Sequence, residues 1–233
     1  MERMNKKAVV LLSGGLDSAT VMAVASSEGF IVHALSFDYG QRHSIELKKA
    51  EEVARFFRAR HQIISVPNVM FQGSALTSTD IAVPKDGFGS MENSQIPPTY
   101  VPARNTVFLS LALGYGEVVG AFDIFIGANS IDYSGYPDCR GEYLRAFEVM
   151  ANLALKETVE GRASVKIHAP LLTLRKEEIV ALGLSLGVDY AMTHSCYDPD
   201  DSGRSCGRCD SCRLRLAAFA ANGISDPISY SNS

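Results

Sequence analysis

Residues 13–18 read SGGLDS and follow the apolar run AVVLL, at a point where a strand would pass into a helix. The backbone N–H groups of Gly14 and Gly15 can wrap around an anion, and the positive end of the following helix points at the same place. Ser13 and Ser18 add hydroxyl donors. These features predict a phosphate site. The alternative is an ordinary glycine-rich turn whose aspartate caps the helix.

The loop carries a carboxylate where other phosphate loops carry a cation. Walker loops place a lysine on the β- and γ-phosphates, whereas Asp17 takes a nearby position here. A carboxylate beside phosphates makes sense if it reaches Mg²⁺, directly or through water, because Mg²⁺ prefers oxygen ligands. We therefore expect Asp17 to serve a magnesium–phosphate group.

Four of the five cysteines crowd into one stretch with the spacing C-x9-C-x2-C-x2-C, and Cys139 stands alone. Two thiolates of a tight x2 turn can reach one tetrahedral ion, and clustered thiols in a reducing compartment are more often metal ligands than disulfides. Four sulfurs close the coordination sphere, which predicts a structural zinc site with no place for His194. An iron–sulfur cluster and unbound thiols are the alternatives. The expected ligands are Cys196, Cys206, Cys209 and Cys212.

A second group of polar side chains lies in GANSIDYSGYPDCRGEYLRAF, residues 127–147, directly after another apolar run. Solvated surface turns have a similar composition, so the segment alone leaves both interpretations open. The stretch YVPARNTVFLS brings Arg104 and Asn105 to the start of a helix, where the arginine could meet a carboxylate, a phosphate or only solvent. The polar residues of the segment include Asn129, Asp132, Tyr133, Ser134, Tyr136, Asp138, Arg140 and Glu142.

Short apolar runs alternate with helical patterns along the chain. Several runs are apolar throughout, which is typical of strands in a parallel sheet covered on both faces. The alternation predicts a doubly wound α/β sheet, whose ligands bind beyond the carboxyl ends of the strands. SGGLDS, DYGQRH and the 127–147 segment all follow expected strands, which favours one shared active site. The expected strands are 8–13, 31–37, 61–66, 123–128 and 165–172.

The helical patterns differ in how much of their surface is apolar. Residues 44–57 have one apolar face, residues 107–119 are apolar almost all round and predict a buried helix, and residues 142–159 again have one apolar face. Thr173 is expected to cap a helix that ends near Gly187. Residues 67–100, rich in Gly, Ser and Pro, are expected to form a long loop.

Composition bounds the class of protein. The 233 residues are 46% hydrophobic and 21% charged, typical of a soluble globular protein. A net charge of −4 gives no overall reason to expect a nucleic-acid or membrane partner. No apolar run approaches the roughly 20 residues of a membrane span, and the N-terminal run does not match a signal peptide. We expect a cytoplasmic protein with a nucleotide-binding domain (1–190) and a zinc-binding segment packed on it (191–233).

The hexapeptide resembles the PP-loop of the ATP pyrophosphatases, which cleave ATP between its α- and β-phosphates. The ordered set LLSGGLDS, FDYGQRH, VPARN, DYSGYPDCR and the four-cysteine tail resembles one branch of that group, the 7-cyano-7-deazaguanine synthases of the queuosine precursor pathway, from about Lys6 to about Ile228. The resemblance implies an adenine nucleotide alpha hydrolase-like fold. It also implies a ligase that converts 7-carboxy-7-deazaguanine, ammonia and ATP to 7-cyano-7-deazaguanine, AMP and pyrophosphate through adenylated intermediates.

The resemblance further implies ATP with Mg²⁺, a structural Zn²⁺, small-molecule substrates and a homodimer. Asp17, Ser18 and Arg104 are the implied catalytic residues. A carboxylate can accept two hydrogen bonds from the guanine-like edge of the substrate. The implied ATP-binding residues are Leu11, Leu12, Ser13, Gly14, Gly15, Leu16, Asp17, Ser18, Ala19, Thr20, Val21, Ser36 and Phe37, and the substrate-binding candidates are Asp132, Tyr133, Tyr136 and Asp138.

Asp138 is the preferred base-reading carboxylate, because Pro137 fixes its backbone; the alternative is that it caps a helix starting near Gly141. Two other functions stay open. Some PP-loop enzymes thiolate tRNA through catalytic cysteines, for which Cys139 is the one thiol outside the cluster. A zinc-stapled nucleotide-binding module without turnover is the other. The sequence shows no nucleophilic cysteine paired with a histidine, as a glutaminase would need. Free ammonia is therefore the expected nitrogen source.

Overall fold

The computed structural model describes residues 6–86, 96–131 and 136–231, and its centre is a five-stranded parallel sheet. The strand order is β3-β2-β1-β4-β5. Val10 of β1 is in register with Ala34 of β2 on one side and with Phe125 of β4 on the other. The predicted doubly wound parallel sheet is therefore confirmed. The strands are β1 (Lys7–Leu11), β2 (Ile31–Asp38), β3 (Arg60–Ser65), β4 (Asp123–Phe125) and β5 (Lys166–His168).

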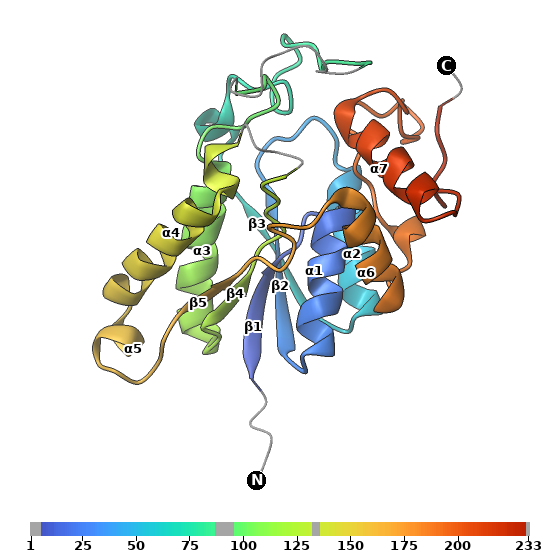
Figure 1. Ribbon diagram of the computed structural model, residues 1–233. Helices are drawn as coiled ribbons and strands as arrows, with labels where there is room; N and C mark the ends of the chain where they lie inside the picture. Colours follow the sequence, from blue (N-terminus) through green and yellow to red (C-terminus); the bar gives the residue numbers. More distant parts are fainter. Residues whose placement is uncertain (1–5, 87–95, 132–135, 232–233) are drawn as a thin grey trace.

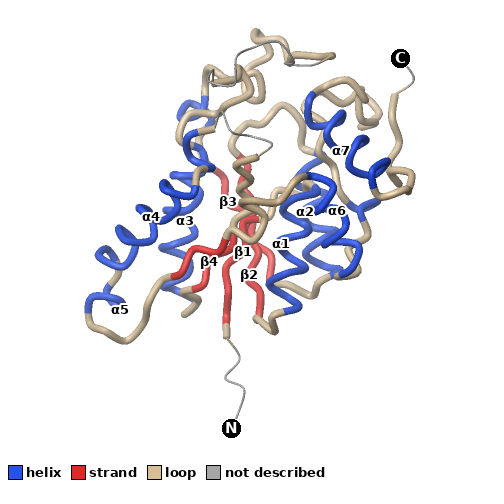
Figure 2. Tube along the Cα trace, viewed as in Figure 1, coloured by secondary structure: helices blue, strands red, loops and turns tan. Residues whose placement is uncertain are grey.

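Helices cover both faces of this sheet (Figures 1 and 2). Figure 1 shows α1, α2 and α6 on one side and α3 and α4 on the other, with α7 beside α6. The α-helices are α1 (Leu16–Ser27), α2 (Ile45–Phe56), α3 (Arg104–Val119), α4 (Gly141–Ala154), α5 (Lys156–Val159), α6 (Lys176–Ser185) and α7 (Asp210–Ala221), and the short 3-10 helices are η1 (Asn68–Phe71), η2 (Pro137–Cys139) and η3 (Tyr190–Met192).

Strand β1 is apolar throughout because each of its faces meets a separate core. Successive side chains of a strand point to opposite faces. Ala8 and Val10 pack in the core formed with α1, α2 and α6. Val9 and Leu11 pack in the core formed with α3 and α4. All four are at most 8% exposed, so the continuous apolar run is what a central parallel strand requires.

The strand order reverses between β1 and β4, and this placement fixes where a ligand can bind. The chain runs outward from β1 to β2 and β3, then crosses back to β4 and β5. In open α/β sheets the crevice lies at such a switch point, beyond the carboxyl ends of the strands. Gly127, just after β4, meets the Asp17 and Ser18 backbone there: a Cβ on Gly127 would lie 3.5 Å from Ser18 N. The 13–18 loop therefore occupies the switch point.

Three expectations about the helices need correction. The helix that was expected to end near Gly187 is α6, which begins at Lys176 with Arg175 as its N-cap. Residues 171–174 first form a turn, so Thr173 does not cap it. Helix α3 is buried along one side only, and Val118 is 83% exposed. The 142–159 pattern is interrupted at Leu155, whose backbone is extended (φ −94°, ψ 146°) between α4 and α5.

Part of the long 67–100 loop packs against the cysteine-rich segment. Val83 lies in one apolar cluster with all four clustered cysteines. The Asp86 N–H donates to the Arg208 carbonyl at 2.9 Å, and Lys85 forms an ion pair with Asp198 at 2.8 Å. Residues 75–86 are thereby held to the C-terminal segment over a large sequence separation.

Candidate active site

The 13–18 loop is shaped by one glycine that no other residue could replace without a shift. Gly14 adopts φ +84°, and a Cβ there would collide with the Glu46 carbonyl and lie 2.6 Å from the Ala50 N atom. The loop therefore lies directly on α2. A left-handed conformation favours glycine, and the close approach to α2 excludes any side chain.

Hydrogen bonds within the loop hold its polar atoms in a small concave surface. The Ser13 and Ser18 hydroxyl oxygens lie 3.0 Å apart, and the Gly15 N–H donates to Ser13 Oγ at 3.3 Å. The Ser18 hydroxyl donates to the Gly15 carbonyl at 3.1 Å. Helix α1 starts at Leu16, so its N-terminal N–H groups face the same point. This is the arrangement that binds a phosphate.

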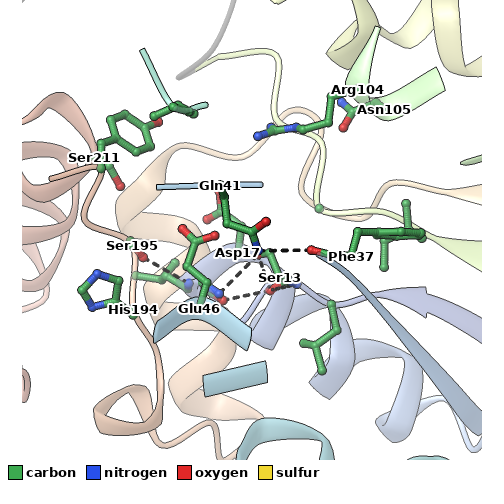
Figure 3. A pocket seen from close by; sticks show the side chains of 18 of the residues that line it. Ser13, Asp17, Phe37, Gln41, Glu46, Arg104, Asn105, His194, Ser195 and Ser211 are labelled. Atoms are coloured by element: carbon green, nitrogen blue, oxygen red, sulfur yellow. Dashed lines mark hydrogen bonds between the residues drawn. The ribbon is translucent and has the colours of Figure 1, made fainter. Parts of the chain in front are cut away.

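The C-terminal segment braces this loop from outside, which the sequence did not indicate. The His194 N–H donates to the Gly14 carbonyl at 2.9 Å. The Leu16 N–H donates to Ser195 Oγ at 3.3 Å, and Figure 3 shows Ser195 at the edge of the cavity. The loop therefore depends on residues about 180 positions later in the chain, as the separation of 179 between Leu16 and Ser195 shows.

Lys176, which follows the edge strand β5, forms an ion pair with the aspartate of the 13–18 loop. Lys176 Nζ lies 2.9 Å from both carboxylate oxygens of Asp17. The lysine side chain is 8% exposed and the aspartate side chain 21% exposed. The phosphate loop thus has a cation after all, supplied by the first residue of α6, which follows β5. Sequence reasoning missed Lys176 because the pair is separated by 159 residues.

A cavity of about 250 Å³ extends from this loop toward an aromatic wall. Phe37 and Phe108 stack with centroids 4.0 Å apart and planes 8° from parallel. Arg104 Nη1 donates to the Tyr39 hydroxyl at 3.5 Å, and Tyr136 also lines the wall. The cavity therefore joins a phosphate-binding end to a flat, largely apolar end that carries the Arg104 guanidinium, a shape suited to an aromatic anion.

Ionisable groups on this wall are strongly affected by burial. Burial raises the pKa of Tyr39, although the nearby Arg104 opposes that shift. Burial also raises the pKa of Glu46 to about 7, again against the pull of Arg104. Tyr39 and neighbouring phenolic groups keep the pKa of Arg104 above its usual value despite its burial, so the guanidinium stays charged.

The predicted ATP-binding residues separate into two groups. Most of them line the cavity, whereas the rest are buried behind it; Thr20 bonds the Leu16 carbonyl at 3.0 Å, and Ser36 bonds the Leu12 carbonyl at 2.6 Å. The lining group is Leu11, Leu12, Ser13, Gly15, Leu16, Asp17, Ser18 and Phe37, and the group behind it is Gly14, Ala19, Thr20, Val21 and Ser36.

The predicted substrate residues are placed differently from one another. Asp132 and Tyr133 lie outside the described residues. Tyr136 lines the cavity. Asp138 is 6% exposed and lies behind the lining; its carboxylate accepts from the Asn105 N–H at 3.0 Å. Asp138 therefore holds the start of α3, the helix that begins at Arg104.

Cys139 lines the cavity but is poorly suited to act as a nucleophile. Burial raises its pKa to about 11, with the Asp138 carboxylate adding to the effect. The Asn105 side chain donates to its sulfur at 3.3 Å. A thiol with such a pKa is almost entirely protonated at neutral pH, and the thiolate is the reactive form.

The four clustered cysteines are brought together as predicted. Their Sγ atoms all lie within 4.8 Å of one another, and all four residues are buried. Backbone N–H groups point at the sulfurs: Cys206 N lies 3.2 Å from Cys196 Sγ, and Cys209 N lies 3.3 Å from Cys206 Sγ. Such donors favour the thiolate form of cysteine. The four sulfurs fit a metal ion whose coordination positions are all filled by protein, so that none is open to a substrate.

No helix within 6–86, 96–131 and 136–231 is both long and apolar enough to cross a membrane.

Known proteins match the chain in both sequence and fold. A family model described as "Queuosine biosynthesis protein QueC" matches residues 7–223. Among curated proteins, the 7-cyano-7-deazaguanine synthase of Geobacter metallireducens is 61% identical over 228 residues, covering 97% of this chain and 94% of that protein. The enzyme of the same name from Frankia casuarinae is 58% identical over 221 residues, covering 94% and 92%.

Solved structures share the fold at much lower identity. An NMN synthetase from Francisella tularensis superposes with a TM-score of 0.50 at 17% identity, covering 95% of this chain and 79% of that one. A predicted tRNA methyltransferase subunit from Methanocaldococcus jannaschii gives 0.51 at 14% identity, covering 97% and 93%. These two likenesses concern the fold alone, whereas the family match and the curated relatives span nearly the whole sequence, so the chain belongs to the QueC family of queuosine biosynthesis proteins.

Proposed function

We propose that the protein is an ATP-dependent ligase that converts 7-carboxy-7-deazaguanine and ammonia to 7-cyano-7-deazaguanine, releasing AMP and pyrophosphate. The observation that carries this proposal is the continuity of the cavity. Its one end is a glycine loop with the Asp17–Lys176 pair, and its other end is an aromatic wall with Arg104. Family membership supplies the substrate.

The carboxylate of the substrate is a poor electrophile until it acquires a leaving group. The 13–18 loop and Lys176 bind the phosphates, and the substrate carboxylate attacks the α-phosphorus of ATP, expelling pyrophosphate. Ammonia then displaces AMP to form an amide. A second ATP adenylates the amide oxygen, and loss of AMP with the nitrogen protons gives the nitrile. Catalysis rests on positioning and charge stabilisation, with no protein nucleophile.

The proposal assigns a role to each of the main side chains of the cavity. Arg104 pairs with the substrate carboxylate, and the Ser13 and Ser18 hydroxyls turn from their bonds within the loop to donate to phosphate oxygens. Asp17 orients Lys176 and would help to hold Mg²⁺, which would neutralise phosphate charge. Each of its oxygens keeps a lone pair beyond the bond to Lys176. The remaining predicted residues of the 11–21 stretch, with Ser36 and Phe37, support or line the adenosine site.

Recognition of the deazaguanine ring is assigned to the 129–142 segment. Tyr136 lines the cavity and can stack on the ring, and Asp132 with Tyr133 remain candidates for the guanine-like edge. Asp138 contributes by holding Asn105 and hence Arg104, which is why we prefer Asp132 as the base-reading carboxylate.

The bound metal is proposed to be Zn²⁺, because four cysteine sulfurs without an open position are typical of structural zinc. A cytoplasmic location remains a prediction from the sequence, and a homodimer remains a prediction from the resemblance.

The test is to measure AMP release with and without 7-carboxy-7-deazaguanine and ammonium, and to identify the product by mass spectrometry. The proposal expects AMP release that requires the deazaguanine, and a product with the mass of the nitrile. Release of ADP, or sulfur transfer to tRNA by a Cys139-dependent route, would contradict it.

A further inference from the structure

Glu46 is a half-buried ionisable group that neither the phosphate site nor the ring site uses. It is the second residue of α2, and its side chain lines the cavity. Across 6–86, 96–131 and 136–231, no hydrogen bond or ion pair reaches its carboxylate. A carboxylate that is partly removed from water and has no protein partner gains stability when a ligand supplies one.

Glu46 lies between the phosphate loop and the wall of the cavity that carries Arg104. Its own carbonyl packs against Gly14 of the phosphate loop, and Arg104 is the charge that acts most strongly on its carboxylate. Figure 3 shows Glu46 and Arg104 extending into the cavity from different walls. The ionisable groups that line the same space, besides Glu46 and Arg104, are Asp17, Tyr39, Arg42, His43, Tyr136, Cys139, Lys176, His194, Cys196, Tyr197 and Arg215.

The reagents of the proposed reaction differ in charge, and only one of the reacting molecules suits a carboxylate. ATP and 7-carboxy-7-deazaguanine are anions, which a carboxylate repels. Ammonia is present at neutral pH mostly as the ammonium cation, which has four N–H donors and no lone pair for attack. It must lose a proton before it can react, and a carboxylate whose pKa lies near the working pH is matched to that task.

We propose that Glu46 binds ammonium beside the adenylated substrate and removes its proton, so that ammonia is formed where it attacks. This inference rests on the proposed function. It assigns to one side chain both the binding of the nitrogen donor and its activation, and it explains why that side chain is left without a partner in the cavity.

The proton balance of the two nitrogen steps fits one carboxylate. In the first step the Glu46 carboxylate takes a proton from ammonium. The nitrogen lone pair forms the bond to the acyl carbon, AMP leaves with the bridging oxygen, and a second nitrogen proton is released to give the neutral amide. In the nitrile step the adenylated amide loses its remaining N–H protons while the C–O bond to AMP breaks. Glu46, deprotonated again through solvent, accepts one of them.

The experiment compares Glu46→Gln with Glu51→Gln. Glu51 lies on the same helix, its side chain is 61% exposed, and it pairs with Arg55, so it is a matched control away from the cavity. Three reactions are measured for each protein: pyrophosphate–ATP exchange that depends on 7-carboxy-7-deazaguanine without ammonium, amide and nitrile formation with ammonium, and hydroxamate formation with hydroxylamine. Hydroxylamine is mostly neutral at neutral pH and needs no base to become a nucleophile.

For Glu46→Gln we expect exchange and hydroxamate formation within a few-fold of the unaltered protein. We expect kcat/KM for ammonium to fall about 100-fold or more, the usual contribution of a general base. Glu51→Gln should match the unaltered protein in all three reactions.

Three outcomes would overturn the proposal. Loss of exchange in Glu46→Gln would mean that Glu46 serves the phosphates or Mg²⁺. Equal losses with ammonium and hydroxylamine would mean that it only shapes the cavity, and an unchanged ammonium reaction would exclude any role with the nitrogen. Absence of exchange in the unaltered protein would instead refute the proposed function itself.

Discussion

Asp17 contributes to the stability of the fold as well as to the phosphate site. Both of its oxygens accept from Lys176, whose side chain is only 8% exposed. Removing one partner of a buried ion pair leaves an uncompensated charge, which usually costs several kcal/mol. We therefore expect Asp17 to support the fold in addition to its place in the phosphate site.

We therefore expect Asp17→Asn to abolish AMP formation and also to lower the free energy of unfolding by about 2 kcal/mol, a value reduced from the buried-pair range because Asp17 keeps some exposure. Urea denaturation measures the stability. The double variant Asp17→Asn with Lys176→Met should recover stability without activity. A single variant as stable as the unaltered protein would show that Lys176 does not depend on Asp17.

Glu46 should make stability depend on pH in a definite direction. Its pKa is raised from 4.5 to about 7 in the folded protein, so the folded state holds the proton more tightly than the unfolded state does. The carboxyl group then favours folding most below pH 4.5, and this contribution is lost as the pH rises through about 7.

Glu46→Gln cannot lose that contribution, because its side chain does not titrate. We expect the Tm of this variant, measured without ligands, to exceed that of the unaltered protein by a margin that grows between pH 5 and pH 8. Groups such as His194, whose pKa burial lowers to about 4, are common to both proteins and cancel. Parallel Tm curves would mean that the Glu46 pKa is not raised.

At the scale of elements, the predictable features were those that repeat or lie close together in the sequence. The apolar run of β1 predicted a central strand because both of its faces meet a core. The 13–18 loop was recognisable because its glycines, hydroxyls and helix start are adjacent in sequence. The x2 spacings of the cysteines fixed their convergence in the same way.

What could not be predicted arises from tertiary packing between distant segments. In the sequence, Lys176 is one of several adjacent charged residues, which is typical of an exposed segment. The connection from β5 to α6 brings it to Asp17. Glu46 resembled the polar side of an amphipathic helix, although α2 turns that position toward the cavity. Asp138 was expected at a ligand, but the start of α3 is close enough to take its carboxylate.

The cysteine cluster links several elements, so removing its metal should affect more than the cluster. Residues 75–86 pack on it, and the adjoining His194 and Ser195 hold the phosphate loop. We expect a chelator to increase hydrogen exchange in both 75–86 and 194–212 and to weaken binding of a non-hydrolysable ATP analogue, since metal binding contributes folding free energy.

Elemental analysis before chelation should find one zinc per chain. Hydrogen exchange that increases only within 196–212, with unchanged binding of the ATP analogue, would show that the metal site does not stabilise the phosphate loop. About four irons with sulfide per chain would identify a cluster of another kind.

At the scale of the whole molecule, the cavity draws on nearly every part of the fold. The loop after β1 supplies the phosphate site, the end of β2 and the start of α2 supply one wall, and α3 supplies Arg104. Lys176 comes from α6, and the C-terminal segment braces the loop. Because these segments meet where the strand order reverses, the site depends on the complete sheet.

The central claim is that this one cavity adenylates the substrate twice, and oxygen labelling tests it most directly. The substrate is 7-carboxy-7-deazaguanine with ¹⁸O in both carboxylate positions, supplied with ammonium and unlabelled ATP, and the products are analysed by mass spectrometry. The account predicts two AMP per nitrile, each AMP carrying one ¹⁸O, with no label in pyrophosphate. A single AMP per nitrile, or label appearing in inorganic phosphate or water instead of AMP, would contradict it.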